Sequence, residues 1–358
     1  MSALTLRPTT SFRAPSSAFA PRPAELRGEA RDGVRMLVAR PGGLCHARFH
    51  DVPGQVEAGD VVVVNDSATV AAQVDARWFG ATAPTGSIDV VLHAATRLDD
   101  GTWVVELRSA PDAARAVLDA RGGDVVRTAG PVLRLLDPYP KGASSPTGHG
   151  NRLWRAAADD DLGAHLRREG RPIAYGYLDR RYPLSAYQTV FGHRPGSAEM
   201  PSAGRPFTAS TVTALVARGV AVVPVTLHTG VSSQEAGEGP APERFVVPAS
   251  TARLVNAARR GGGRVIAVGT TVTRALESAV DADGLVAARA GWTERVVTPA
   301  DPPRVVTGLV TGWHDPAASH LLLVEAVAGP ELTQRAYAAA VAGGYLWHEF
   351  GDSALLLP

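Results

Sequence analysis

Polar residues that could do chemistry follow three apolar segments, each of which is expected to be a buried strand. They are Asn65-Asp66 after 61–64, His228-Thr229-Gly230 after 220–227, and Gly269-Thr270-Thr271 after 264–268. The carboxyl ends of strands in an open α/β sheet gather at one edge, where ligands bind. We therefore expect these side chains to lie along one crevice, where N–H groups at a helix start can hold an anion or a carboxylate.

The helix expected after Gly269 carries two further candidates, Arg274 and Glu277. Thr270 or Thr271 is placed to cap its start. Arginine suits bidentate contact with a carboxylate. An ordinary strand–turn–helix with an internal Arg–Glu pair three residues apart has the same pattern. Both interpretations stay open from these residues alone.

The other two strand ends are equally open to a structural interpretation. His228 could act as a base or proton donor near neutral pH, although a single histidine at a strand end is more often structural. Asn65 and Asp66 could bind ribose hydroxyls, or they could satisfy a turn through their own backbone.

The elements that must position these residues alternate between apolar strands and helices. This order predicts an α/β fold with a mostly parallel or mixed sheet covered by helices. Residues 71–157 differ, because short alternating runs separated by turn signals predict a small all-β barrel. We expect this barrel domain to be inserted between two parts of an α/β domain, 23–70 and 158–358. Residues 1–22 are expected to be a mobile leader, and further strands are expected at 294–297, 305–310 and 345–350.

Composition excludes several classes of protein. The net charge of the 358 residues is +1, so no basic excess marks a nucleic-acid binder. Cys45 is the single cysteine, which excludes an internal disulfide and favours the cytoplasm. No apolar run reaches the roughly 18 residues of a membrane helix. Metal-ligand spacing, a dinucleotide Gly-x-Gly-x-x-Gly and a Gly-x-Ser-x-Gly elbow are missing from the sequence, so we expect no metal, nicotinamide or flavin.

A set of motifs in a fixed order resembles one family, the S-adenosylmethionine:tRNA ribosyltransferase-isomerases of queuosine biosynthesis. The run 263–278, Gly-Arg-Val-Ile-Ala-Val-Gly-Thr-Thr-Val-Thr-Arg-Ala-Leu-Glu-Ser, is the most specific part, and the resemblance covers about 23–357. The other matching segments are Gly59-Asp-Val-Val-Val-Val-Asn-Asp66, Tyr187-Gln-Thr-Val190, Gly196-Ser197, Pro201-Ser-Ala-Gly204, Phe207-Thr208, Thr226-Leu-His228 and Gly351-Asp352.

The resemblance implies an α/β domain with an inserted β-barrel, and a ribosyl-transfer reaction. In it, S-adenosylmethionine gives its ribosyl carbons to the aminomethyl group of a 7-deazaguanine in tRNA, and adenine and methionine leave. The matching positions would then divide into two groups. His228 and Glu277 would move protons, and the substrates would be bound by Asn65, Asp66, Tyr187, Gln188, Ser202, Gly204, Gly269, Thr270, Thr271 and Arg274.

Several loops depart from the family's motifs. Ile173-Ala-Tyr-Gly-Tyr-Leu178 stands where the family has Leu-Pro-Pro-Tyr-Ile, and Gly312-Trp-His314 replaces Asn-Phe-His. Arg205-Pro206-Phe207 replaces Leu-His-Phe, and the His/Glu motif expected within 229–243 is not recognisable apart from Glu243. The departures leave two rivals: a member with a different, small-molecule acceptor, and a catalytically silent nucleoside-binding homologue. The sequence does not define the oligomeric state; a monomer is slightly favoured, with tRNA as a partner if the family's acceptor is kept.

Overall fold

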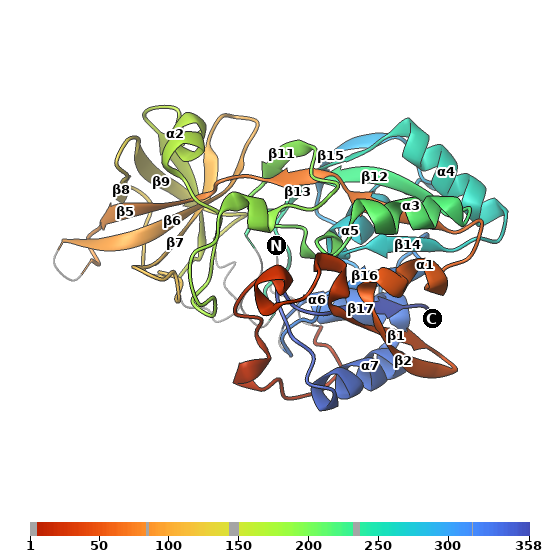
Figure 1. The fold of residues 1–358 in the computed structure, drawn as a ribbon. Helices are drawn as coiled ribbons and strands as arrows, with labels where there is room; N and C mark the ends of the chain where they lie inside the picture. The colour runs from red at the N-terminus through yellow and green to blue at the C-terminus, as the bar shows by residue number, and fades with distance from the viewer. Residues whose placement is uncertain (1–5, 84–85, 143–149, 232–236, 317) are drawn as a thin grey trace.

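The computed structural model describes residues 6–83, 86–142, 150–231, 237–316 and 318–358. Figure 1 shows two bodies side by side, a β-barrel and a larger layered α/β body. The chain enters the barrel from the α/β body and returns to it, so the barrel is an insertion in the fold, as expected. The exact domain boundaries stay a prediction.

The α/β body is built on one sheet of nine strands. Its order is β15 (Arg289–Thr293), β13 (Glu243–Val247), β12 (Ala221–Leu227), β3 (Val61–Asn65), β14 (Val265–Val268), β16 (Gly308–Thr311), β17 (Ser353–Leu356), β1 (Arg35–Arg40) and β2 (Gly43–Arg48). The central strands β12, β3, β14 and β16 are parallel, whereas both edges contain antiparallel pairs. The sheet is therefore mixed, and its parallel centre brings several strand ends to one edge.

Strand β3 shows why the sheet has helices on both faces. All its residues are buried, and successive valines point to opposite sides. Val61 and Val63 join the core beneath α4 (Ala249–Arg260), α5 (Thr270–Ser278), α6 (His320–Ala328) and α7 (Pro330–Ala342). Val62 and Val64 join the core beneath α1 (Val52–Gln55) and α3 (Ala209–Ala217). A continuous apolar strand is stable here because both of its faces are covered.

The inserted barrel is closed, in the order β10 (Leu153–Ala158), β7 (Trp103–Ser109), β6 (Ser87–Arg97), β5 (Gln73–Phe79), β8 (Val125–Arg127) and β9 (Val132–Pro138). Trp78, Leu92 and Leu107 fill its interior. Leu162 and Leu166 of α2 (Leu162–Glu169) join the same core. A small two-stranded sheet pairs β4 (Ser67–Thr69), which precedes the barrel in the chain, with β11 (Arg194–Ser197), which follows it.

A buried ion-pair chain links the barrel to the α/β body. Glu106, which is fully buried, accepts from Arg108 at 2.7 Å and from Arg152 at 3.0 Å. Arg152 also pairs with Glu238, in the segment before β13, at 2.6 Å. The Glu106 pKa is held well below its usual range by these arginines and by His93, despite burial.

Three expectations from the sequence need correction. Residues 6–22 are packed rather than a mobile leader: Thr10 donates to the buried carboxylate of Glu325 at 2.6 Å, and the Phe12 ring lies 4.7 Å from Tyr337. No strand forms over 294–297, because β15 ends at Thr293. Residues 345–350 are not a strand, because the side chain of Asp352 accepts the Leu346 N–H that a strand would give to a neighbour.

None of the described helices has both the length and the apolar character needed to cross a membrane.

Candidate active site

A cavity of about 740 Å³ lies at the carboxyl edge of the parallel strands. Its lining includes 229–231 after β12, and 268–271 and 311–315 at the ends of β14 and β16. Arg108, Asp112 and Ala114 of the barrel line another side. The cavity therefore occupies the ligand position expected for an α/β sheet, and the inserted barrel helps to enclose it.

Gly269 makes the sharp turn from β14 into the cavity. Its φ is 94°, its N–H donates to Val310 at 2.8 Å, and a Cβ added here would lie 3.3 Å from Ala203 Cβ. Glycine is required by this backbone conformation. Gly269 itself is the N-cap of α5, so the expectation that Thr270 or Thr271 caps the helix is wrong. Both threonines instead line the cavity at a helix start that no side chain caps.

Arg274 also lines the cavity, but it already has protein partners. It forms an ion pair with Glu243, and it donates to the carbonyls of Arg295 and Ala241 at 3.0 Å and of Thr293 at 3.3 Å. Burial raises the Glu243 pKa, while Arg274 opposes that shift. We call Arg274 and Glu243 the buried clamp, because together they tie α5 to β13 and β15. A role for Arg274 in holding a substrate carboxylate stays a prediction.

Glu277 does not face the cavity. Its side chain is almost fully buried, and its carboxylate accepts the backbone N–H groups of Arg304, Val305 and Val306 at 2.8, 2.9 and 3.0 Å. These bonds hold the segment that enters β16. The position of Glu277 thus supports a structural role and not the proton transfer expected from the sequence.

His228 lies behind the cavity wall, while the next two residues, Thr229 and Gly230, are in it. Its Nδ1 is 2.7 Å from Ser67 Oγ, and a Cβ added at Gly196 would lie 2.4 Å from that nitrogen. Burial lowers the His228 pKa, so the neutral ring is favoured. The suggestion that His228 is a base stays a prediction.

The side chains at the end of β3 hold neighbouring strands. Asn65 donates to Leu227 O at 2.8 Å and accepts from Leu227 N at 3.0 Å, which closes the gap between β3 and β12. Asp66 accepts from Thr226 Oγ1 at 2.6 Å and pairs with Arg194 at 3.3 Å. Neither lines the cavity.

The remaining expected residues divide between the cavity and its support. Ser202 lines the cavity, at the start of the short helix η6 (Ser202–Gly204), whereas Gly204 does not. Gln188 exchanges hydrogen bonds with the backbone of Thr69 at 3.1 and 2.7 Å. Tyr187 is buried against Phe350, with ring centroids 5.1 Å apart. The structure thus brings Ser202, Gly269, Thr270, Thr271 and Arg274 together and places the others behind them.

Reasoning from the sequence missed many residues of the cavity lining. They are tyrosines, histidines and acids from distant segments: Tyr175, Tyr177, Glu199, His314, His320, His348 and Glu349. The rings of His314 and His320 stack at 4.8 Å, and burial lowers the His320 pKa to about 4. The tyrosine-dense loop at 173–178 and the altered motif at 312–314 were visible signals, but no spacing connects them to 348–349.

Carboxylates outnumber guanidinium groups in the lining that the structure describes. Asp112, Glu199, Glu243, Asp315 and Glu349 are present against Arg108 and Arg274. Such a cavity favours a ligand that carries positive charge. The described residues contain no group of three or more histidine, cysteine or acidic side chains arranged to hold a metal ion.

Comparison with known proteins identifies the family of this chain. A family model described as "Queuosine biosynthesis protein" matches residues 9–356. Curated S-adenosylmethionine:tRNA ribosyltransferase-isomerases from Methylobacterium radiotolerans and Nitrobacter winogradskyi are 35% and 36% identical, and each alignment covers 97% of this chain and 96% or 97% of the relative.

A solved structure supports the fold. The crystal structure of an S-adenosylmethionine tRNA ribosyltransferase from Thermotoga maritima aligns with a TM-score of 0.53 and 23% identity, over 97% of this chain and 99% of that one. With matches along nearly its whole length, the chain belongs to the queuosine biosynthesis protein family that contains the S-adenosylmethionine:tRNA ribosyltransferase-isomerases.

Proposed function

We propose that this protein is a cytoplasmic transferase-isomerase. It transfers the ribosyl part of S-adenosylmethionine to a 7-aminomethyl-7-deazaguanine in tRNA, and adenine and methionine are released. The observation that carries the proposal is the cavity at the strand edge, whose acid excess suits a sulfonium substrate and an amine acceptor, in a chain that matches the family over 9–356.

The first turn of α5 is the proposed place for the methionine carboxylate. Thr270 and Thr271 line the cavity there, and the positive end of the helix dipole favours an anion. The buried clamp, which also lines the cavity, ties α5 to β13 and β15. Gly269 allows the approach, because its turn leaves no side chain between β14 and the substrate.

The sulfonium would lie toward the acidic and aromatic side of the cavity. Aromatic faces and carboxylates both attract a desolvated cation. A sulfonium acidifies the neighbouring C5′ hydrogens of the ribose, so a base can remove one of them, and the adenine can then leave. The groups closest to this chemistry are the acids and histidines of the cavity lining, and not Glu277.

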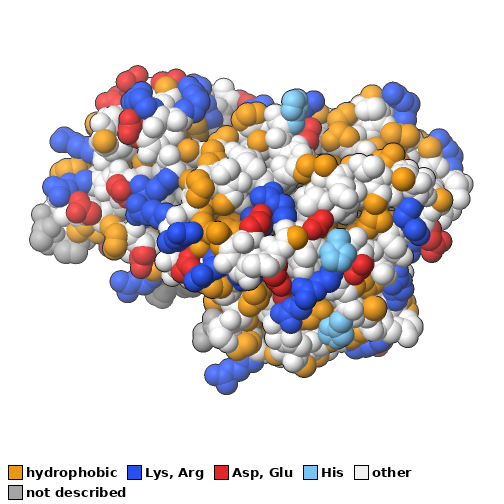
Figure 2. All heavy atoms as spheres, viewed as in Figure 1, with side chains coloured by type: hydrophobic (Ala, Val, Ile, Leu, Met, Phe, Trp, Pro, Cys, Tyr) orange, Lys and Arg blue, Asp and Glu red, His pale blue; other side chains and the backbone are white. Residues whose placement is uncertain are grey.

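The face that Figure 2 shows has no strongly basic patch to which tRNA would bind. Figure 2 shows basic and acidic side chains interspersed over the visible surface, in keeping with the net charge of +1. Contacts of the acceptor base inside the cavity would then supply much of the specificity. The phosphate contacts would be few and distributed over the surface.

Product analysis tests the proposal. Purified protein is incubated with S-adenosylmethionine, with and without tRNA that carries the aminomethyl-deazaguanine, and adenine and methionine are measured. Release that requires this tRNA is the expected result. Turnover without tRNA would indicate another acceptor, and binding without release in either condition would indicate a silent homologue. Both of these results contradict the proposal.

A further inference from the structure

One side of the cavity contains two tyrosine–glutamate pairs. The Tyr175 hydroxyl donates to Glu199, and the Tyr177 hydroxyl donates to Glu349. The two tyrosine rings face each other with centroids 6.4 Å apart and planes 24° apart. We call Tyr175, Tyr177, Glu199, His348 and Glu349 the tyrosine–glutamate wall; all of them line the cavity.

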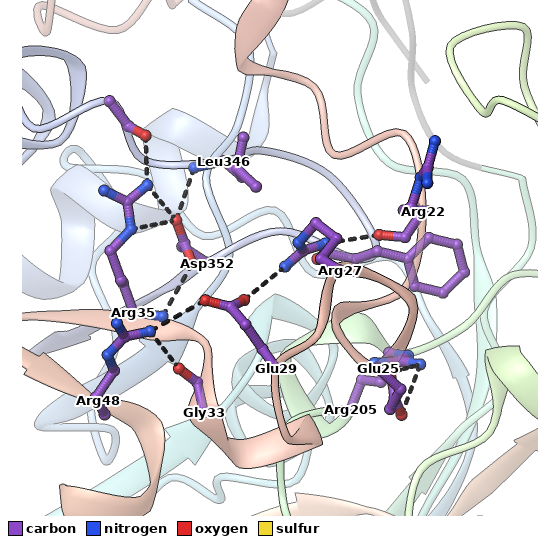
Figure 3. A network of polar contacts seen from close by, with 12 residues as sticks. Arg22, Glu25, Arg27, Glu29, Gly33, Arg35, Arg48, Arg205, Leu346 and Asp352 are labelled. Atoms are coloured by element: carbon purple, nitrogen blue, oxygen red, sulfur yellow. Dashed lines mark hydrogen bonds and ion pairs between the residues drawn. The ribbon is translucent and has the colours of Figure 1, made fainter.

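The segment that carries Glu349 is held at several points. Asp352 accepts from Leu346 N at 2.8 Å and binds Arg35 through both of its oxygens, as Figure 3 shows. Arg27 donates to the carbonyl of Phe350 at 2.9 Å. These contacts fix the backbone on both sides of Glu349, so its side chain reaches the cavity from a rigid base.

His348 turns the backbone just before Glu349. Its φ is 67°, in the left-handed region that residues other than glycine rarely adopt. Its ring stacks on Tyr177 at 4.9 Å, and its Nε2 is 3.7 Å from Asp315. Residues in such conformations persist where the surroundings fix them, and they concentrate at functional sites. Here the turn directs Glu349 to the Tyr177 hydroxyl.

The two pairs differ in the charge beside them. The Arg108 guanidinium lies over the Tyr175 ring at 5.2 Å, next to the pair with Glu199. The pair with Glu349 instead has the His348 ring beside it, and burial lowers the His348 pKa, which Asp315 partly opposes. Glu349 is thus the acid of this wall without an adjacent permanent cation among its described contacts.

We propose that Glu349 is the group that receives the proton of the acceptor's primary ammonium, with Tyr177 as the positioning residue that orients its carboxylate. The inference rests on the proposed function. In this step the ammonium N–H bond breaks, its electron pair stays on nitrogen, and the proton forms an O–H bond with Glu349. The neutral amine is then the nucleophile that the transfer requires.

The electrostatics of the site suit such a step. Burial raises the Glu349 pKa to about 7, so this carboxylate can accept a proton near neutral pH and release it again. The titratable and charged groups around it are Tyr177 on the facing loop, His348 beside it in the chain and Asp315 after β16, with Glu199 and Arg108 beyond Tyr175. Arg205, paired with Glu25, lines a second small cavity with Glu349. An ammonium ion entering this acidic side would find an anionic partner.

The test compares Glu349→Gln with wild type and with Glu199→Gln, from pH 5.5 to 9.5. Adenine release is followed at saturating S-adenosylmethionine and aminomethyl-deazaguanine tRNA. At neutral pH we expect Glu349→Gln to lose roughly 10²–10⁴-fold in rate, the usual contribution of a general base. Its rate should then rise about tenfold per pH unit, because bulk solvent deprotonates an aliphatic amine whose pKa is about 10. Wild type should be nearly flat above pH 7.

Controls separate this role from a structural one. S-adenosylmethionine binding by calorimetry shows that Glu349→Gln is folded, and Glu349→Asp, which keeps the carboxylate, should recover part of the rate at neutral pH. Glu331→Gln, an exposed acid at the start of α7, controls for the loss of a charge.

Two results would overturn the inference: a wild-type rate and pH profile for Glu349→Gln, or the pH-dependent defect appearing in Glu199→Gln instead. Wild type that releases no adenine would overturn the proposed function, and this step with it.

Discussion

Two walls of the cavity differ in whether neighbouring or distant residues of the chain form them. The strand-edge wall, formed by Gly269, Thr270, Thr271 and Arg274, comes from one continuous segment. The tyrosine–glutamate wall is assembled from 175–177, 199 and 348–349, which meet only in the folded structure. The first wall depends on a local turn and a helix start, whereas the second depends on tertiary contacts of loops. In our account the first holds the ribosyl donor and the second receives the acceptor.

The largest effect is expected from breaking the buried clamp. Arg274→Ala leaves the Glu243 carboxylate buried without its cation, which typically costs about 3–5 kcal/mol. Urea unfolding measures the loss of stability, and calorimetry should show weakened S-adenosylmethionine binding. The double variant with Glu243→Ala should lose less than the sum of the two single variants. Additive losses would mean that the pair is not coupled, and unchanged affinity would remove Arg274 from the substrate site.

A smaller effect, on stability alone, is expected at Glu277. Glu277→Gln replaces one accepting oxygen by an amide that cannot accept a backbone N–H, which costs about 1–3 kcal/mol. The melting temperature should fall while the pH profile of adenine release keeps its shape. A changed profile would return Glu277 to the chemistry and would extend the active site beyond the cavity lining.

Two titratable residues of the cavity lining, His320 and Glu349, should also affect how stability depends on pH. The folded pKa of His320 is about 4, below its usual 6.5, so unfolding takes up a proton and stability falls as the pH drops from 6.5 toward 4. The folded pKa of Glu349 is about 7, above its usual 4.5, so its contribution has the opposite sign: it is present below 4.5 and is lost as the pH rises through 7. Between 4.5 and 6.5 the two slopes oppose each other.

Without Glu349, the contribution of His320 to the pH dependence of stability is no longer opposed. The free energy of unfolding of Glu349→Gln, from urea titrations, should fall more steeply than that of wild type as the pH drops from 6.5 to 4.5. The difference in slope should be up to about 1.4 kcal/mol per pH unit. Parallel curves for the two proteins would contradict a raised Glu349 pKa.

The smallest effect is expected at His228, behind the strand-edge wall. His228→Gln keeps a polar side chain near Ser67 and should cost about 0.5–1.5 kcal/mol, the net value of one hydrogen bond. The rate of adenine release by the folded variant should stay close to that of wild type. Loss of turnover in a folded variant would restore His228 as the base.

Local sequence patterns predicted most of the sheet, but fewer of the residues that line the cavity. Val61–Val64 and Val265–Val268 are short apolar runs, followed by Asn65 and Gly269. Such runs predict buried parallel strands correctly, because a strand that is covered on both faces is apolar at every position. The barrel was visible from short alternating runs. The strand predicted at 345–350 was wrong because its aromatic residues favour strands. In the structure the Asp352 side chain accepts the Leu346 N–H, a contact that a residue pattern does not reveal.

The chemistry of side chains could not be read in the same way. Asn65 ends β3, and Asp66 and His228 directly follow strands, yet their polar groups bond to neighbouring strands and do not line the cavity. Whether a strand-end residue points into a site depends on its rotamer and neighbours, which spacing does not define. Tyr177 and Glu349 meet across 172 positions of sequence, and a contact of this kind requires the tertiary structure.

A crystal structure of the complex with S-adenosylmethionine tests the division between the two walls most directly. We expect the methionine carboxylate at the first turn of α5, beside Thr270 and Thr271, with the sulfonium toward the tyrosine–glutamate wall. A carboxylate bound on the Glu349 side, or S-adenosylmethionine bound outside this cavity, would contradict it.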